Sequence, residues 1–180
     1  MLLTHIVKND SAERELVQHL YEESFPPQER MPFDLIMEIN ELPKVSLEAV
    51  YDDGKFIGFY LLMLNEQTVY VAFMAVMPDE RLKGYGSAII NHLKKIYSGY
   101  DILLDEEPLY EGASNYEERV HRKAFYEKNG FTSTGYIIHA YGVDYEILTT
   151  SPDFEYEEYV DVFKNNGFDR FTPVIVRKPD

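Results

Sequence analysis

A glycine-containing segment between a strand pattern and a helix pattern limits most strongly how this chain can fold. Residues 68–76 (TVYVAFMAV) are apolar and rich in β-branched side chains, a pattern typical of a strand. Gly84 and Gly86 follow, and residues 86–98 repeat apolar side chains at helical spacing. Glycines at such a junction permit a tight turn, and they can also leave main-chain N–H groups open to an anion. The segment therefore predicts either a plain connection or an anion-binding turn.

The next strand pattern, DILLD at residues 101–105, indicates how strand 68–76 is paired. The helical crossover between them is long enough to make the strands around Val71 and Leu103 parallel neighbours. A glycine turn after the first strand of such a pair lies where open α/β sheets bind ligands. The centre of the chain thus predicts a parallel pair beside a ligand site.

The flanking patterns predict an α/β fold with a mixed, mostly antiparallel sheet, a central splayed parallel strand pair and flanking helices. Asp10 and Glu13 have capping-box spacing, at the start of a helix with Leu16, Val17 and Leu20 on one face. The other expected elements are a strand at 2–7, a helix at 33–42, a hairpin at 45–51 and 56–64, a helix at 115–131, a closing hairpin at 133–141 and 143–150, and a tail with a helix at 154–167 and a strand at 172–178.

Size and charge restrict the classes of function. The 180 residues suit one domain with a sizeable core, and no apolar run approaches the ~18 residues of a membrane span. A net charge of −15 repels nucleic acid and anionic membranes and favours a cationic substrate or partner, although acids also simply keep a protein soluble. The chain has no cysteine and starts without a secretory signal pattern, so we expect a cytoplasmic protein. Its five histidines show no metal-ligand spacing, so we assign no metal.

The glycine turn departs from two phosphate-binding motifs. A P-loop needs Gly-x-x-x-x-Gly-Lys-Ser/Thr, and no glycine stands five residues before a Gly-Lys pair. A dinucleotide fingerprint needs a third glycine where this chain has Ile89. A third interpretation remains, in which N–H groups at the start of a helix and the positive end of its dipole bind a pyrophosphate. The predicted donors are Leu82, Lys83, Gly84, Tyr85, Gly86 and Ser87.

Two motifs resemble those of the GNAT N-acetyltransferase superfamily. The segment AVMPDERLKGYG (75–86) is similar to its acetyl-CoA-binding motif, apolar-Val-x-Pro followed by Arg/Gln-x-x-Gly-x-Gly/Ala. The segment AFYEKNGF (124–131) looks like its closing-helix signature. The resemblance covers residues 1–148, which we expect to form an acetyltransferase domain. Residues 149–180 have no family counterpart and are expected to form an extension packed on that domain.

The resemblance implies that acetyl-CoA is the co-substrate and indicates where it binds. Its pyrophosphate is expected at the main-chain donors of the turn together with Arg81. Its pantetheine arm is expected along the preceding strand, at Met74 and Val76. Arg119 stands where many members carry an asparagine; it is a candidate for a CoA phosphate and equally for an ion pair along its own helix.

Acyl transfer from a thioester needs a proton donor for the leaving thiolate and a group that takes the proton of the amine. The resemblance assigns the donor to Tyr126. Some members carry a glutamate on the strand before the turn, but residues 68–76 contain none. Glu106 and Glu107 follow the next strand, and we prefer Glu107 as the base, with an acidic loop facing water as an equal alternative.

The acceptor side is expected to be built from the first helices and the closing hairpin, with Phe25, Glu29, Arg30 and Glu106 as candidate contacts. We predict an N-acetyltransferase that moves acetyl from acetyl-CoA to a primary amine by direct transfer in a ternary complex. The alternative is a non-catalytic acyl-CoA sensor or interaction module on the same fold, which the missing strand carboxylate favours. A third hypothesis makes residues 151–180 an oligomerisation arm, which implies a homodimer.

Overall fold

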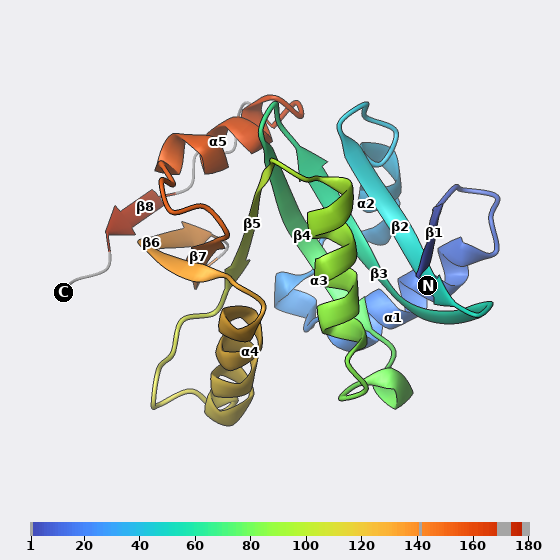
Figure 1. Ribbon diagram of the computed structural model, residues 1–180, viewed down its shortest axis with the longest axis horizontal. Helices are drawn as coiled ribbons and strands as arrows, with labels where there is room; N and C mark the ends of the chain where they lie inside the picture. Colours follow the sequence, from blue (N-terminus) through green and yellow to red (C-terminus); the bar gives the residue numbers. More distant parts are fainter. Residues whose placement is uncertain (1, 141, 169–173, 178–180) are drawn as a thin grey trace. The chain divides into compact units, whose positions relative to one another are not determined.

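The computed structural model describes residues 2–140, 142–168 and 174–177 (Figure 1). Its strands are β1 (Leu3–Ile6), β2 (Val45–Asp52), β3 (Lys55–Leu64), β4 (Thr68–Val76), β5 (Asp101–Glu106), β6 (Thr132–Ala140), β7 (Val143–Thr149) and β8 (Val174–Arg177). Its α-helices are α1 (Glu13–Ser24), α2 (Phe33–Ile39), α3 (Tyr85–Ile96), α4 (Tyr116–Lys128) and α5 (Tyr156–Lys164), and its 3-10 helices are η1 (Pro27–Glu29) and η2 (Pro78–Glu80).

The strands follow the order β1-β2-β3-β4-β5-β7-β6-β8. The β1/β2, β2/β3, β5/β7, β6/β7 and β6/β8 pairs are antiparallel. Strands β4 and β5 are parallel, with Tyr70 opposite Leu103. The predicted mixed sheet with its parallel pair is therefore confirmed.

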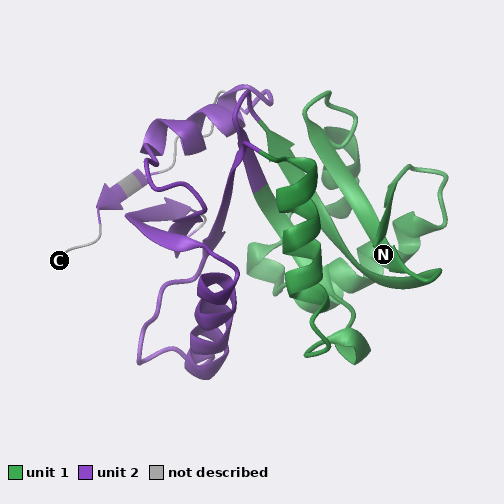
Figure 2. Cartoon of the chain, viewed as in Figure 1, with its two compact units in different colours: residues 1–64, 71–98 green, residues 65–70, 99–180 purple. Residues whose placement is uncertain are grey.

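The chain divides into two compact units, which Figure 2 distinguishes by colour. Unit 1 comprises residues 1–64 and 71–98, and unit 2 comprises residues 65–70 and 99–180. Strand β4 contributes to both, because Thr68–Tyr70 belong to unit 2 and its remaining residues to unit 1.

In unit 1, α3 lies on one face of strands β2 to β4, and α1 and α2 lie on the other (Figure 1). Apolar side chains from these layers form a core with less than 2% of each side chain exposed. They include Val17, Leu20, Leu47, Phe59, Leu61, Ile89 and Leu93.

Two predictions about α1 are wrong. The capping box of Asp10 and Glu13 does not form, because the helix begins at Glu13 and no side chain caps its N-terminus. Leu16 is 43% exposed, and Tyr21 joins Val17 and Leu20 on the buried face instead. In α3, Ile96 is likewise 53% exposed, since the last turn of an amphipathic helix can extend past the core it covers.

The end of β4 lies unusually close to β3, and a glycine makes this possible. A Cβ atom added at Gly58 would be 2.2 Å from the carbonyl oxygen of Ala75. The N–H of Met77 donates to the carbonyl of Ile57 at 2.8 Å. The segment that leads into the glycine turn is thus held against β3 by main-chain contacts.

Unit 2 contains the strands β5, β7, β6 and β8 together with the helices α4 and α5. The tail is part of this unit: β8 pairs antiparallel with β6 of the same chain, and Tyr159 and Val162 of α5 are buried. Helix α5 begins with a capping box between Glu155 and Glu158, which the sequence analysis missed. The predicted residues 172, 173 and 178 of the tail strand, and Tyr141 of the closing hairpin, lie outside the described residues.

Candidate active site

The glycine turn of unit 1 has the backbone geometry expected of an anion-binding helix start. Gly84 is the N-cap residue of α3 and has a left-handed conformation, with φ +89°. The first helical hydrogen bond runs from the N–H of Ala88 to the carbonyl of Gly84 at 3.0 Å. The N–H groups of the preceding first turn, including those of Gly86 and Ser87, have no acceptor within an α-helix.

The second glycine of the turn differs from the first in conformation. Gly86 lies inside the first turn of α3 and not in the left-handed region. Leu82 occupies that region instead, with φ +61°, and its side chain is fully exposed. Because a non-glycine residue in this conformation is strained, the surrounding contacts must hold the turn in place.

A buried carboxylate supplies such contacts. Glu80 in η2 is 4% exposed and forms ion pairs with Lys55 of β3 and Lys83 of the turn, the latter at 3.2 Å. Hydrogen bonding from Lys55, joined by Lys83, lowers the pKa of Glu80. The Tyr85 hydroxyl lies 3.2 Å from Asp52 at the end of β2. Side chains on both sides of Gly84 are thus tied to the sheet.

Arg81 connects the turn to β4 and α1. Its Nε donates to the carbonyl of Val76 at 3.2 Å, and its Nη2 lies 3.4 Å from the hydroxyl of Ser24. Next to Ser24, the ring of Phe25 packs edge-on against Phe73 of β4, with centroids 5.0 Å apart. Arg81 and Phe25 therefore meet the same end of α1.

The other predicted residues of unit 1 lie near these groups in the chain. Met74 and Val76 are half-buried on β4. Glu29 ends η1, and the Nη1 of Arg30 donates to the carbonyl of Glu22 at 3.0 Å.

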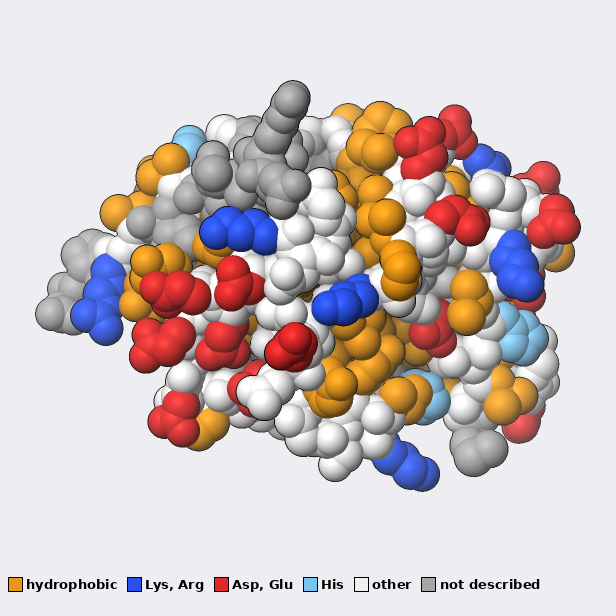
Figure 3. Space-filling view, turned by 90° about the horizontal axis from the view of Figure 1, so that it is seen from above, with side chains coloured by type: hydrophobic (Ala, Val, Ile, Leu, Met, Phe, Trp, Pro, Cys, Tyr) orange, Lys and Arg blue, Asp and Glu red, His pale blue; other side chains and the backbone are white. Residues whose placement is uncertain are grey.

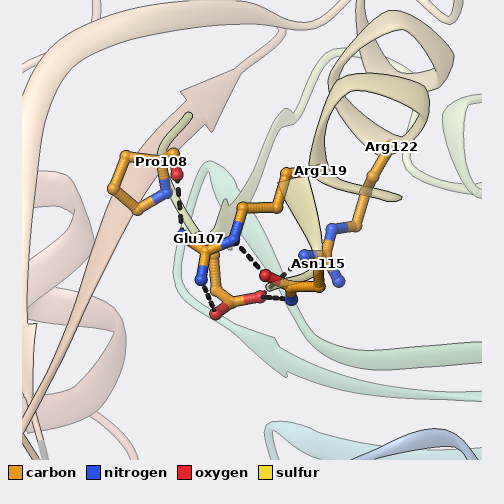
Figure 4. A network of polar contacts seen from close by, with 5 residues as sticks. All are labelled: Glu107, Pro108, Asn115, Arg119 and Arg122. Carbon is orange, nitrogen blue, oxygen red and sulfur yellow. Dashed lines mark hydrogen bonds and ion pairs between the residues drawn. The ribbon is translucent and has the colours of Figure 1, made fainter. Parts of the chain in front are cut away.

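In unit 2, Glu107 is the centre of a polar network, drawn in Figure 4. Its two oxygens lie 2.5 Å from Arg119 and 2.9 Å from Arg122, and Asn115 donates to it at 3.1 Å. Arg119 also donates to Asn115 and to the carbonyl of Pro108, at 2.8 and 2.9 Å. The carboxylate of Glu107 and the guanidinium group of Arg119 are thus both engaged by partners within unit 2.

Glu106, the preceding residue, has the opposite environment. It is 5% exposed at the end of β5, and its Oε2 atom is buried with no hydrogen-bond partner among the described residues. Burial raises the pKa of Glu106 to about 7, although Arg122 and Lys123 act in the other direction. At neutral pH this carboxyl group can therefore both hold and release a proton.

Tyr126 lies on α4, the helix that also carries Arg122 and Lys123. Its ring is half-buried between Phe125 and Phe131, with centroids 5.1 and 5.8 Å away. Desolvation raises the pKa of Tyr126 to about 12, with a smaller contribution from Glu106. None of the hydrogen bonds within the described ranges uses its hydroxyl, which stays protonated at neutral pH.

The sequence analysis missed two buried acids of unit 2. Glu146 of β7 is fully buried directly opposite Glu106. Asp105 accepts hydrogen bonds from the hydroxyls of Tyr70 and Tyr159, at 2.7 and 2.9 Å, and burial raises its pKa. A charged residue within an apolar strand pattern, as in both segments, was the available signal.

The predicted site residues are thus divided between the units. Those of the β4 strand end, the glycine turn and the α1 end belong to unit 1, and Glu106, Glu107, Arg119 and Tyr126 belong to unit 2.

Acidic side chains are exposed at many places on the face in Figure 3, in line with the net charge of −15. Among the described residues, no group of three or more His, Cys, Asp or Glu side chains can hold a metal ion. No helix in the described ranges has the length and apolar character needed to cross a membrane.

Comparison with known proteins adds the family. Residues 46–133, which include the glycine turn, α4 and the segment after it to Phe131, match the acetyltransferase (GNAT) domain. The fold is similar to that of a Bacteroides thetaiotaomicron protein assigned to the GNAT acetyltransferases, with TM-score 0.73, 21% identity and coverage of 91% of this chain and 94% of that one.

Two further solved structures share the fold at lower identity. One is the ribosomal-protein-S18-alanine N-acetyltransferase from Escherichia coli, with TM-score 0.62, 18% identity and coverage of 86% and 96%. The other is a GNAT family acetyltransferase from Elizabethkingia anophelis with acetyl-CoA bound, with TM-score 0.57, 15% identity and coverage of 83% and 97%. The domain match at residues 46–133 covers both predicted motifs and confirms the resemblance to the GNAT superfamily that was recognised from the sequence, and the solved structures share the fold.

Proposed function

We propose that this protein is an N-acetyltransferase that moves acetyl from acetyl-CoA to a primary amine by direct transfer in a ternary complex. The observation that carries the proposal is Glu106, a buried carboxyl group with one oxygen unpartnered among the described residues and a pKa of about 7. A likeness to N-acetyltransferases of known fold, including one that acts on an alanine of a ribosomal protein, supports the choice of an amine.

The residues of the glycine turn fit the diphosphate of acetyl-CoA. The proposed donors are the N–H groups from Leu82 to Ser87 at the start of α3, where the helix dipole adds about half a positive charge. Gly84 keeps its left-handed turn free of a side chain, and Arg81 is the proposed cationic contact from the same segment. In this proposal Met74 and Val76 lie along the pantetheine arm. Acetyl-CoA itself supplies an acetyl group already activated as a thioester, so the chain needs no covalent intermediate.

Glu106 is proposed as the group that takes the proton of the amine. A lysine-like ammonium has a pKa of ~10.4, so an ordinary carboxylate near 4.5 lies about six pKa units below it. Burial of Glu106 narrows that gap to about three units, which makes the proton transfer less unfavourable by about 3 kcal/mol.

This assignment revises the preference for Glu107 as the base. Each oxygen of Glu107 already accepts from an arginine, at 2.5 and 2.9 Å. Protonating it would break two charge-assisted bonds, whereas protonating Glu106 breaks none. Arg119 is likewise engaged by Glu107, Asn115 and Pro108, so we now propose a structural role for it in place of CoA binding.

Tyr126 is proposed as the proton donor to the leaving thiolate. Its pKa of about 12 keeps the hydroxyl protonated throughout the working range. The unpaired hydroxyl is available to a ligand, because no described side chain accepts from it.

The acceptor is proposed to be a cationic amine, such as a polyamine, an aminoglycoside or a protein amino group, because the surface is acidic. Phe25, Glu29 and Arg30 remain proposed contacts for it.

We further propose a cytoplasmic protein without a metal, nucleic-acid or membrane partner, and a homodimer that sedimentation velocity can test. We also propose residues 1–148 as the acetyltransferase domain and 149–180 as its extension, supported by the Tyr159–Asp105 hydrogen bond.

The test is release of CoA from acetyl-CoA in the presence of a panel of primary amines, with mass spectrometry of the product. Glu106→Gln keeps the shape of the side chain and should lower kcat/KM by about 100-fold or more on the preferred amine. Glu118→Gln, on the exposed face of α4, is the matched control and should change little. CoA binding without turnover on any amine would contradict the proposal and favour the non-catalytic sensor.

A further inference from the structure

Glu106 faces a second buried carboxylate across the sheet. In the antiparallel register of β5 and β7, Glu106 pairs directly with Glu146. Glu106 is 5% exposed and Glu146 is 0% exposed. Directly opposed residues of an antiparallel pair have Cβ atoms about 5 Å apart, so two like charges here would repel strongly without compensation.

The direct contacts that offset this repulsion are made to one member of the pair, Glu146. The Nζ of Lys123 on α4 lies 3.3 Å from the Oε2 of Glu146, and the hydroxyl of Ser133 on β6 donates to its Oε1. Glu106 receives no such partner, and its Oε2 is both buried and unbonded within the described residues.

Arg122 follows the same pattern. This second cation near Glu106 is also held by another carboxylate, since its Nη2 lies 2.9 Å from Glu107. Each nearby cation is therefore engaged elsewhere, Lys123 by Glu146 and Arg122 by Glu107.

We propose that Glu146 is a positioning residue that holds Lys123 away from Glu106 and so keeps Glu106 free to accept a proton from the substrate. This inference rests on the proposed function, because it explains why Glu106, the proposed base, does not form an ion pair with Lys123. Glu146 does not touch the reacting atoms in this account; it acts through Lys123.

The charged groups with the largest electrostatic effect on Glu106 belong to two elements. Helix α4 contributes Arg122, Lys123 and Glu127, together with Tyr126, and β7 contributes Glu146. Burial is the main cause of the raised pKa of Glu106; Arg122 and Lys123 lower this pKa, whereas Glu146 and Glu127 raise it further.

Two substitutions should therefore shift the pKa of Glu106 in opposite directions. Glu146→Gln keeps an acceptor for Ser133 but releases Lys123, whose flexible side chain can then pair with Glu106 and lower its pKa. Lys123→Met removes the cation, leaves both carboxylates facing each other and raises the pKa of Glu106. Because Glu146 also raises the pKa of Glu106 by direct repulsion, release of Lys123 is identified by the part of the Glu146→Gln shift that disappears when Lys123→Met is combined with it.

The experiment is a carbon-13 NMR titration of the Glu106 side-chain carboxyl in the full chain, with Glu106→Gln used to assign the signal. Glu146→Gln should lower the pKa of Glu106 by about one unit or more, and Lys123→Met should raise it. Glu118→Gln controls for the loss of one distant surface charge and should leave the pKa of Glu106 in place. An unchanged or raised pKa in Glu146→Gln overturns the proposal.

Activity measurements separate this inference from the proposed function. The acid limb of kcat/KM should move with the NMR value in each variant. A Glu146→Gln shift that shrinks in the Lys123→Met background, with full turnover in Glu106→Gln, would support the control of Lys123 by Glu146 but overturn the assignment of Glu106 as base. If Glu146→Gln does not fold, Lys123→Met alone decides, and a lowered or unchanged pKa of Glu106 overturns the proposal.

Discussion

The glycine turn of unit 1 and the acidic cluster of unit 2 are built from different parts of the chain. At residues 82–87 the proposed ligand contacts are main-chain N–H groups, and side chains such as Leu82 point into solvent. At the end of β5 the proposed chemistry depends on single side-chain atoms, above all the buried Oε2 of Glu106. The first site should tolerate changes of side chain that keep the backbone conformation, whereas the second should respond to the loss of one atom.

The largest expected effect tests the second half of this comparison. Tyr126→Phe removes one oxygen and should lower kcat by about 10³-fold, equivalent to about 4 kcal/mol, because the leaving thiolate loses its proton donor. The dissociation constant of CoA, measured by calorimetry, should stay almost unchanged. Tyr110→Phe, in a loop where the ring is 66% exposed, is the matched control. Turnover unaffected by Tyr126→Phe would remove that hydroxyl from the mechanism.

The next effect concerns stability and its pH dependence. The pKa of Glu106 is about 7 in the folded chain and 4.5 as its ordinary value. Between pH 4.5 and 7 the folded state therefore keeps the proton on Glu106, whereas the unfolded state loses it. Stability should therefore fall as pH rises from about 4.5 to 7, by about 3 kcal/mol in total. The side chain in Glu106→Gln is uncharged, like the protonated carboxyl group, so the stability of this variant should not fall over that pH range.

Chemical denaturation at two pH values checks this prediction. The variant should be more stable than the parent chain by about 3 kcal/mol at pH 8 and nearly equal to it near pH 4. An equal difference in stability at both pH values would show that Glu106 does not titrate between them.

A smaller effect tests the backbone half of the comparison. Gly84 and Gly54 both have left-handed conformations, with φ +89° and +79°, and a Cβ atom at either would meet nothing within 4 Å. Alanine at either position should therefore cost about 1 kcal/mol of strain. Only Gly84→Ala should also weaken CoA binding, by about fivefold, since Gly54 lies in the β2–β3 turn. Equal CoA affinity in both variants would contradict the diphosphate site.

The same contrast explains how much could be predicted from the sequence. Strand β4 runs from Thr68 to Val76, as the pattern predicted, and the turn after it lies within one short stretch of chain. A site made of consecutive main-chain groups comes from consecutive residues, so its motif can be recognised in the sequence. The fold class followed for the same reason, since each strand and helix has its own local pattern.

The acidic cluster could not be predicted in this way. Glu106 faces Glu146 only because β5 and β7 pair in one register, and a shift by one residue would turn either side chain to the other face. The choice between Glu106 and Glu107 likewise depends on which of two adjacent side chains meets Arg119 and Arg122. Strand alternation places neighbours on opposite faces, but nothing local says which face carries the arginines.

The most direct test of the account is the pH dependence of kcat/KM for the preferred amine, in the parent chain and in Glu106→Gln. We expect the parent chain to lose activity below about pH 7, following protonation of Glu106. The low residual activity of Glu106→Gln should lack this limb. An identical acid limb in both proteins would contradict the assignment of Glu106 as the base.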